Sequence, residues 1–186
     1  MTRLLLLTLL TAVAAFPLEA QEFIPLWPES AMPNSKGLKR PEVIVNERIL
    51  QVETPGMYVF LPSAKQNTGS AVVICPGGGY ERLAYVSAGL ELAKWLNTLG
   101  VNAFVLKYRL PNSPDLKVRH IAPLQDAQRA MRVVRSNAAR WAIDPTKIGV
   151  LGTSAGGHLA STPELTLKTY RRSATRWMRC LSVLTS

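Results

Sequence analysis

A serine set between glycines is the residue of this sequence best placed to do chemistry. Ser154 is the centre of G-T-S-A-G at residues 152–156, directly after the strand-like run 147–151 and before a helix-compatible segment. A serine on such a strand-to-helix turn presents its hydroxyl clear of the sheet, while Gly152 and Gly156 let the neighbouring backbone approach. We therefore predict that Ser154 is a nucleophile for acyl transfer. A phosphate-binding loop is excluded because no lysine follows the glycines at the required spacing.

A second group of glycines would supply hydrogen-bond donors for the same chemistry. Residues 77–79 are three consecutive glycines after the apolar run 71–75. The N–H groups of Gly78 and Gly79, with that of Ala155, would stabilise the oxyanion of a tetrahedral intermediate, at roughly 3 to 4 kcal/mol per well-placed donor. A glycine triplet alone is usually a turn, so this prediction depends on its place before the serine motif in the order of strands.

Strands and helices alternate along the part of the chain that must position these residues. Short β-prone runs at 43–45, 49–52 and 57–61 predict an antiparallel entry to a sheet. Apolar runs at 71–75, 101–106 and 147–151 are typical of strands covered on both faces. Before them, residues 25–41 are rich in proline and predict an extended arm.

Two helices are predicted between the buried strands. The first covers 87–99, with Gly100 as its C-cap and an apolar stripe of Leu92, Ala93, Leu96 and Leu99. The second begins at Pro123, and its apolar stripe consists of Ala127, Ala130, Met131, Val134, Ala138 and Trp141. This alternation predicts an α/β fold with right-handed crossovers, a mostly parallel sheet and helices on both faces.

The ends of the chain differ in composition from its middle. Residues 1–20 have the charged start and short apolar stretch of a secretory signal peptide, so we expect a secreted or periplasmic protein, with an uncleaved membrane anchor as the alternative. Residues 21–162 would form the folded domain. Residues 163–186 are an atypical tail with five basic residues against one acidic residue. The formal net charge of +10 is otherwise scattered, and no basic motif with interleaved aromatic residues accompanies it, so we expect no nucleic-acid partner.

No metal or cofactor is expected from the sequence. Its two histidines and two cysteines are widely separated and offer no ligand spacing. Two cysteines also provide no disulfide framework for an exported protein, so packing must stabilise the fold.

Three segments resemble secreted bacterial α/β-hydrolases of the carbohydrate-esterase kind, relatives of acetylxylan and feruloyl-type esterases. They are Cys75–Tyr80, Leu124–Ala130 and Ile148–Ala160, and the likeness runs from about Glu22 to Ser161. The resemblance implies an α/β-hydrolase fold and ester hydrolysis on acylated polysaccharide or small esters. It also implies Ser154 as nucleophile and the N–H groups of Gly78, Gly79 and Ala155 as oxyanion donors. Pro76 departs from the pattern, because many lipases with an HGGG loop have histidine there.

The base and acid that would complete a catalytic triad are not evident. In this fold they follow the serine in the chain, yet only His158 and Glu164 do so here. His158 would lie one helical turn behind Ser154, with its ring directed away from the hydroxyl. His120 precedes Ser154 and is expected at most to line the site, and Asp126 is expected in the first turn of its helix, favoured by the helix dipole.

We therefore hypothesise that the C-terminal part of the hydrolase domain is missing, through truncation or a frameshift near Ser161. A chain without its triad base should lose orders of magnitude in rate, so we expect little activity from it alone. The alternatives are a fragment of a prolyl-oligopeptidase-like serine peptidase and a non-catalytic fragment of the hydrolase fold. The oligomeric state is left open.

Overall fold

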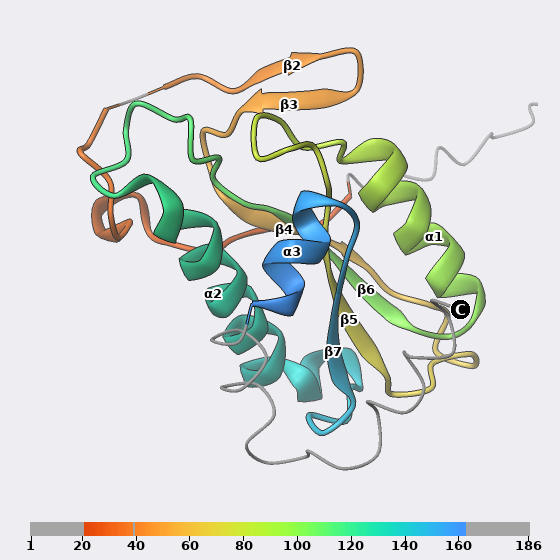
Figure 1. The fold of residues 1–186 in the computed structure, drawn as a ribbon. Coiled ribbons are helices and arrows are strands. Elements are labelled where there is room, and N and C mark those ends of the chain that lie inside the picture. The colour runs from red at the N-terminus through yellow and green to blue at the C-terminus, as the bar shows by residue number, and fades with distance from the viewer. Residues whose placement is uncertain (1–20, 39, 163–186) are drawn as a thin grey trace, which may run out of the picture.

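The apolar runs of the sequence form a five-stranded sheet at the centre of the fold. The computed structural model describes residues 21–38 and 40–162 (Figure 1). The strands lie in the order β1-β4-β6-β5-β7. Their bounds are Phe23–Pro25 for β1, Gly56–Phe60 for β4, Ala71–Cys75 for β5, Asn102–Lys107 for β6 and Ile148–Gly152 for β7.

The sheet changes from antiparallel to parallel across its width. β1 pairs with β4 and β4 with β6 in antiparallel fashion, whereas β5 is parallel to both β6 and β7. The predicted antiparallel strand at the start of the sheet is therefore β4. The predicted parallel arrangement is found in β5 and β7, which lead to the two glycine segments. Because parallel strands end at the same edge, the glycine triplet after β5 and the serine motif after β7 emerge side by side.

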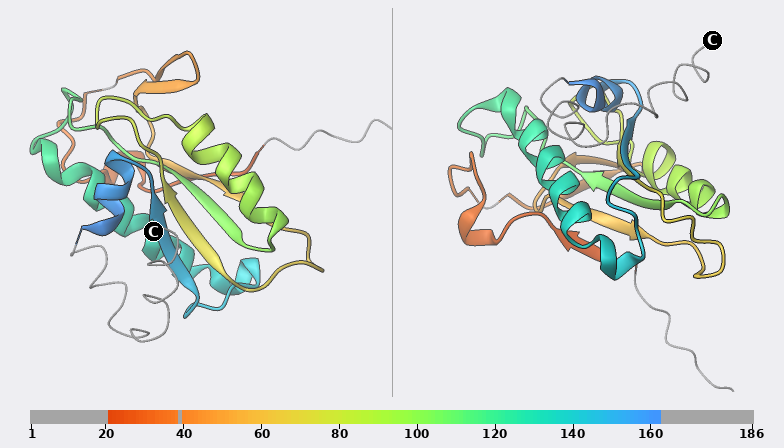
Figure 2. Two further views of the ribbon diagram at one scale, coloured as in Figure 1. Left: turned by 45° about the vertical axis from the view of Figure 1, so that its right-hand side comes forward. Right: turned by 90° about the horizontal axis from the view of Figure 1, so that it is seen from below.

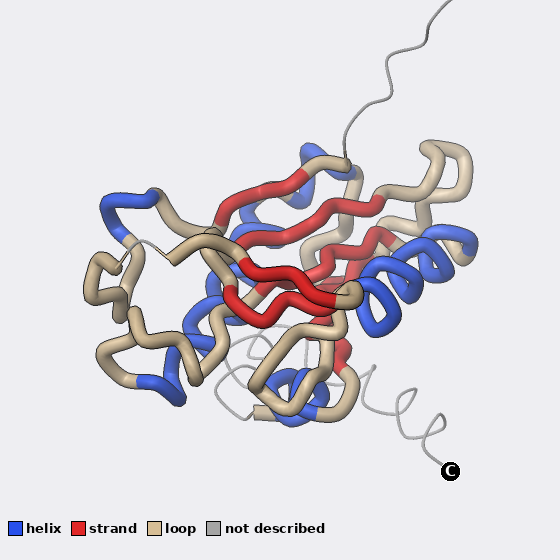
Figure 3. The backbone as a smooth tube through the Cα atoms, turned by 90° about the horizontal axis from the view of Figure 1, so that it is seen from above, coloured by secondary structure: helices blue, strands red, loops and turns tan. Residues whose placement is uncertain are grey.

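Two of the predicted entry strands lie outside this sheet. β2 (Val43–Val45) and β3 (Arg48–Gln51) form a separate antiparallel hairpin, which lies above the main sheet in Figure 1 and in front of it in Figure 3. The hairpin is attached by two backbone hydrogen bonds between Ile49 and Leu83, of 2.8 and 3.0 Å. It therefore packs next to the segment that follows the glycine triplet.

Helices cover both faces of the sheet, as predicted (Figure 2). α1 (Glu91–Thr98) lies over one face, and α2 (Ala122–Ser136) and α3 (Ala155–Ser161) lie over the other. Single-turn 3-10 helices occur at Glu29–Ala31, Arg119–Ile121 and Ala138–Trp141. The six residues of the predicted stripe on and after α2 are all buried, which confirms that stripe.

The helix predicted over 87–99 is not one uniform helix. It begins with a π-helical turn at Val86–Leu90, in which Gly89 packs so closely on β6 that a Cβ there would lie 2.6 Å from Val105 Cγ1. Leu99, predicted on the buried stripe, is 53% exposed because the helix has ended at Thr98. Gly100 has a φ of +75°, as expected of a residue just past a helix end.

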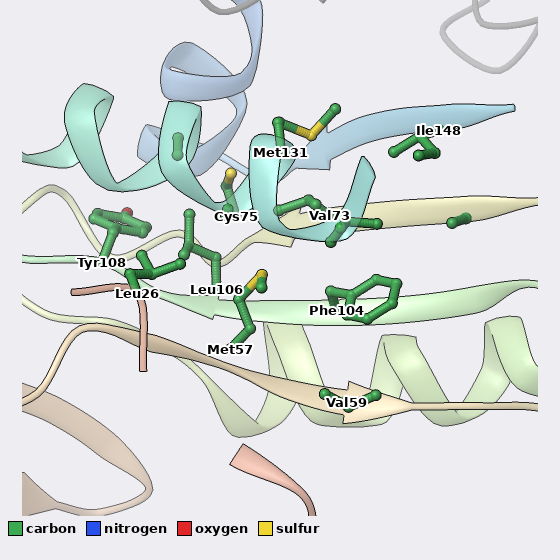
Figure 4. Close-up of a cluster of buried hydrophobic side chains, with 14 of the residues drawn as sticks. Leu26, Met57, Val59, Val73, Cys75, Phe104, Leu106, Tyr108, Met131 and Ile148 are labelled. Atoms are coloured by element: carbon green, nitrogen blue, oxygen red, sulfur yellow. The ribbon is translucent and has the colours of Figure 1, made fainter. Parts of the chain in front are cut away.

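The core forms two layers because successive residues of each strand point to opposite faces. On the α2 side, Val73, Cys75, Phe104 and Leu106 pack with Met131 and Trp141 (Figure 4). On the α1 side, Ile74, Ala103 and Val105 pack with Ala93 and Leu96. β6 is buried along its whole length, as the continuous apolar run predicted.

The predictions for both ends of the chain lie outside the described residues. These are the signal peptide at 1–20 and the basic tail at 163–186. Within the part that the structure describes, no helix is both long and apolar enough to cross a membrane.

Candidate active site

Ser154 has an unusual backbone conformation at the junction of β7 and α3. Its φ is +51° and its ψ −122°, and it is the residue immediately before the helix. Residues with a side chain rarely adopt positive φ, because this conformation costs roughly 1–3 kcal/mol and persists only where the surrounding structure enforces it. The side chain is exposed. This is the sharp strand-to-helix turn that the motif predicts.

The two glycines of the motif allow the backbone contacts that enforce this turn. A Cβ on Gly152 would lie 2.1 Å from the carbonyl oxygen of Gly156. A Cβ on Gly156 would lie 2.0 Å from the carbonyl oxygen of Cys75, at the end of the neighbouring strand. Side chains at either position would therefore push α3 away from the sheet, which explains why both positions are glycine.

The glycine triplet lies against the same turn. A Cβ on Gly77 would lie 2.6 Å from the Thr153 carbonyl oxygen and 3.2 Å from Ser154 Cβ. Gly78 and Gly79 follow with φ values of +140° and +67°. The structure thus brings together the two glycine segments that the sequence analysis paired, although 74 residues separate Ser154 from Tyr80 at the end of the loop.

Within residues 21–38 and 40–162, the N–H groups of Gly78, Gly79 and Ala155, which are predicted to bind an oxyanion, have no hydrogen-bond acceptor. Ala155 is the first residue of α3, where the N–H groups of a helix have no partner within the helix. The role of these three N–H groups as oxyanion donors stays a prediction.

His158 and His120 occupy different places. His158, on α3, is hydrogen-bonded through Nδ1 to the hydroxyl of Tyr80, at 2.9 Å, and not to Ser154. His120 is exposed on the 3-10 turn before α2. In the described part of the chain, no histidine side chain or carboxylate is hydrogen-bonded to the Ser154 hydroxyl, and Glu164 lies outside that part.

Asp126 is not a first-turn residue, so that prediction was wrong. α2 begins at Ala122, which places Asp126 in the second turn, fully buried. Its carboxylate accepts hydrogen bonds from the Arg109 backbone N–H and guanidinium, at 2.8–3.2 Å, and from Trp27 Nε1 at 2.8 Å. The ion pair with the buried Arg109, rather than the helix dipole, explains why this carboxylate can be fully buried.

Two tyrosines of the site were missed from the sequence. Tyr80 follows the triplet with a φ of +60°, and Tyr108 donates a buried hydrogen bond of 2.7 Å to the Pro76 carbonyl oxygen. Burial, and then the proximity of Cys75, raise the pKa of both phenols. Both hydroxyls therefore stay protonated at neutral pH. Nothing in the sequence near Tyr80 indicates its positive φ. Tyr108 directly follows a buried strand, and its position there gives no indication of a hydrogen bond to Pro76.

Cys75 lies beneath the turn and is inert. It is fully buried, and burial raises the pKa of its thiol from the ordinary value of 9.0 to about 12. A neutral, buried thiol is a poor nucleophile. Within the described residues, no group of three His, Cys, Asp or Glu side chains is arranged to hold a metal ion.

A cavity of about 630 Å³ lies away from Ser154. It is lined by the N-terminal arm, the end of β3 and the loop after β6, including Trp27, Gln51 and Asp115. Neither Ser154 nor the glycine triplet contributes to its walls. This cavity is therefore separate from the candidate site, which the backbone geometry at Ser154 defines.

Comparison with known proteins defines the fold class and the ancestry of the chain. A solved structure similar to this one is the acetyl ester-xyloside bifunctional hydrolase from Caldicellulosiruptor lactoaceticus, with 35% identity and a TM-score of 0.57 over 76% of this chain. Esterase 2 of Thermogutta terrifontis, solved phosphonylated by cyclosarin, has 26% identity and a TM-score of 0.51 over 70%. The fold is that of the α/β-hydrolases, and the chain is of esterase ancestry.

The family follows from the sequence itself. The model of the BD-FAE family matches residues 57–173, more than half of the chain, and the chain belongs to that family. The acetylxylan esterase of Xylanibacter ruminicola is 40% identical over 105 residues, which are 56% of this chain and 20% of that protein.

The chain spans only part of the proteins it matches. It covers 20% of the Xylanibacter esterase, 45% of the Caldicellulosiruptor hydrolase and 46% of the Thermogutta esterase. The activities of those complete proteins are therefore a basis for a proposal about this chain.

Proposed function

We propose that this chain carries the nucleophile and oxyanion donors of a secreted serine esterase that acts on acylated carbohydrate. The observation that carries the proposal is the positive-φ turn at Ser154, with a glycine loop packed against it. The proposal is further supported by the exposed position of Ser154 and by the N–H groups of Gly78, Gly79 and Ala155, which have no acceptor among the described residues.

Each group has a defined role in the proposed reaction. Ser154 Oγ attacks the acyl carbon, and the carbonyl oxygen becomes an oxyanion held by the N–H groups of Gly78, Gly79 and Ala155. The ester C–O bond then breaks, and the alcohol leaves with the proton taken from Ser154. Water attacks the acyl-enzyme, releases the carboxylic acid and restores the hydroxyl. The base that moves the proton would come from outside residues 21–162.

Acetyl esters of xylan are the substrates that the comparisons favour. The Xylanibacter relative is an acetylxylan esterase, and the Caldicellulosiruptor protein is an acetyl ester-xyloside hydrolase. Modification of the Thermogutta esterase by cyclosarin supports the use of an organophosphonate as a probe of the nucleophile. Residues 1–20, interpreted as a signal peptide, would deliver the protein to such a polysaccharide outside the cytoplasm.

The test is to measure p-nitrophenyl acetate hydrolysis, acetate release from acetylated xylan and labelling by a fluorophosphonate. Ser154→Ala should abolish all three. Ser161→Ala, which removes an exposed hydroxyl from the same helix, is the matched control and should leave them unchanged. Mass spectrometry of the labelled peptide should place the phosphonate on Ser154.

Other outcomes point to the alternatives. Labelling of Ser154 with peptide cleavage but no ester turnover would favour the serine peptidase. If Ser154→Ala changes neither turnover nor labelling, the proposal is wrong and the chain is a non-catalytic member of the fold.

A further inference from the structure

The loop that carries Gly78 and Gly79 is held firmly at its first end. Tyr108 donates a buried hydrogen bond to the Pro76 carbonyl oxygen, and the Gly77 carbonyl oxygen accepts from the Ala84 N–H at 2.9 Å. Gly77 is also buried against Thr153. Pro76 has no side-chain hydrogen-bonding group, so it cannot anchor the loop as a histidine at that position would.

The two candidate donors of the loop differ in packing. A Cβ on Gly78 would lie 2.1 Å from the Arg82 carbonyl oxygen, and the Gly78 carbonyl oxygen accepts from the N–H groups of Glu81 and Arg82 at 3.2 Å. A Cβ on Gly79, by contrast, would meet no atom within 4 Å, and Gly79 is exposed. A donor contributes to the transition state only if it is fixed where the oxyanion develops, so the Gly79 end of the loop needs a restraint of its own.

Tyr80 provides a contact at this point. Its hydroxyl lies 2.9 Å from His158 Nδ1, and the two rings meet edge to face with centroids 5.9 Å apart. The Tyr80 ring also meets that of Tyr108, the residue that holds Pro76, with centroids 6.3 Å apart. Tyr80 therefore lies between the anchor of the first end and helix α3.

His158 connects this contact to the candidate nucleophile. Its backbone N–H donates to the Ser154 carbonyl oxygen at 3.0 Å, so it occupies the helical turn that begins at Ser154. The Tyr80–His158 hydrogen bond thus joins the residue after Gly79 to the turn that carries Ser154, across 78 residues of sequence. A non-glycine residue at φ +60° persists only where the surroundings enforce it, which agrees with a held position.

We propose that Tyr80 and His158 form a positioning pair that fixes the Gly78 and Gly79 N–H groups relative to Ser154. This inference rests on the proposed function of those groups, and it assigns His158 to loop positioning in place of proton transfer. One neutral hydrogen bond at a partly exposed position corresponds to roughly a 3- to 10-fold effect on the population of the held loop.

The test uses Tyr80→Phe, His158→Ala and the double variant of the full chain. Tyr80→Phe keeps the ring contacts and removes only the hydroxyl. Each single variant should lower kcat for p-nitrophenyl acetate about 3- to 10-fold and leave KM unchanged, and the double variant should lose no more than His158→Ala. Tyr58→Phe, on β4, is the matched control and should retain the wild-type kcat.

Two measurements do not depend on turnover. Amide hydrogen exchange of the loop should become faster in Tyr80→Phe and His158→Ala. In ¹⁵N-histidine spectra of the full chain, Tyr80→Phe should shift the Nδ1 signal of His158 and leave that of His120 unchanged.

Each failure has a distinct meaning. Unchanged loop exchange, or an unchanged kcat in Tyr80→Phe, would overturn the positioning pair even if Ser154 is confirmed as nucleophile. Faster loop exchange in a chain without Ser154-dependent turnover would support the pair as the loop anchor and refute the proposed function.

Discussion

Gly156→Ala tests whether backbone contacts hold the turn at Ser154. Gly156 lies inside α3 with ordinary helical φ, where alanine normally stabilises a helix by about 1 kcal/mol relative to glycine. Here the new Cβ would start 2.0 Å from the Cys75 carbonyl oxygen. Because Cβ atoms are essentially never found within 3.0 Å of such an atom, α3 and β5 must separate by about 1 Å.

The expected magnitude follows from that displacement. Forcing extra atoms into a packed interior costs about 1–3 kcal/mol, so the sign of the usual glycine-to-alanine effect should be reversed. Moving Ser154 by about 1 Å relative to the glycine loop should lower kcat/KM roughly 100-fold. The decrease in kcat/KM should therefore be larger than the decrease expected from the smaller fraction of folded protein.

Urea unfolding followed by circular dichroism measures the free energy of unfolding. Gly149→Ala is the matched control, because it lies on the neighbouring β7 and its Cβ would meet no atom within 4 Å. It should change stability by less than about 1 kcal/mol. If Gly156→Ala is as stable as the wild type, the close packing of α3 on β5 does not enforce the turn.

Two further predictions concern buried ionisable groups. Asp126→Asn leaves the Arg109 guanidinium buried without a charged partner and should lower the free energy of unfolding by about 3–5 kcal/mol in urea titrations, whereas Glu22→Gln, in an exposed ion pair, should lower it by less than about 1 kcal/mol. Equal losses would contradict this account. The raised pKa of Cys75 means that the unfolded thiol loses its proton above pH 9 while the folded thiol keeps it to about pH 12. Between these values, wild-type stability should therefore fall with pH faster than that of Cys75→Ala, by about 1.4 kcal/mol per pH unit, and parallel curves would exclude this.

Local patterns in the sequence predicted the elements around the site well. The stripe on α2 and the three buried strands follow from burial, which sets the spacing of apolar residues in a helix and their continuity in a covered strand. The turn at Ser154 was predictable because its two glycines lie within two residues of the serine and are required by close backbone contacts. The π-helical turn before α1 was not predictable, since its apolar spacing resembles that of an α-helix over so few residues.

Contacts between residues far apart in the sequence could not be predicted from local patterns. Asp126 was assigned to the helix dipole because nothing near it in the sequence indicates that Arg109, 17 residues earlier, is folded against it. Tyr80 and His158 are likewise 78 residues apart, and each alone is an ordinary polar aromatic residue. Their pairing depends on β5 and β7 being neighbours, which only the assembled sheet determines.

The close approach of Gly152, Gly156 and Gly77 to the surrounding backbone has a consequence for how such a site changes over time. The shortest contact of each glycine is made to a main-chain atom, so these contacts place few demands on the identity of the side chains around them. Substitutions that reshape the walls around Ser154 can therefore accumulate without disturbing the reactive turn. In directed evolution of this scaffold, the three glycines should be held constant while the surrounding loops are randomised to change substrate preference.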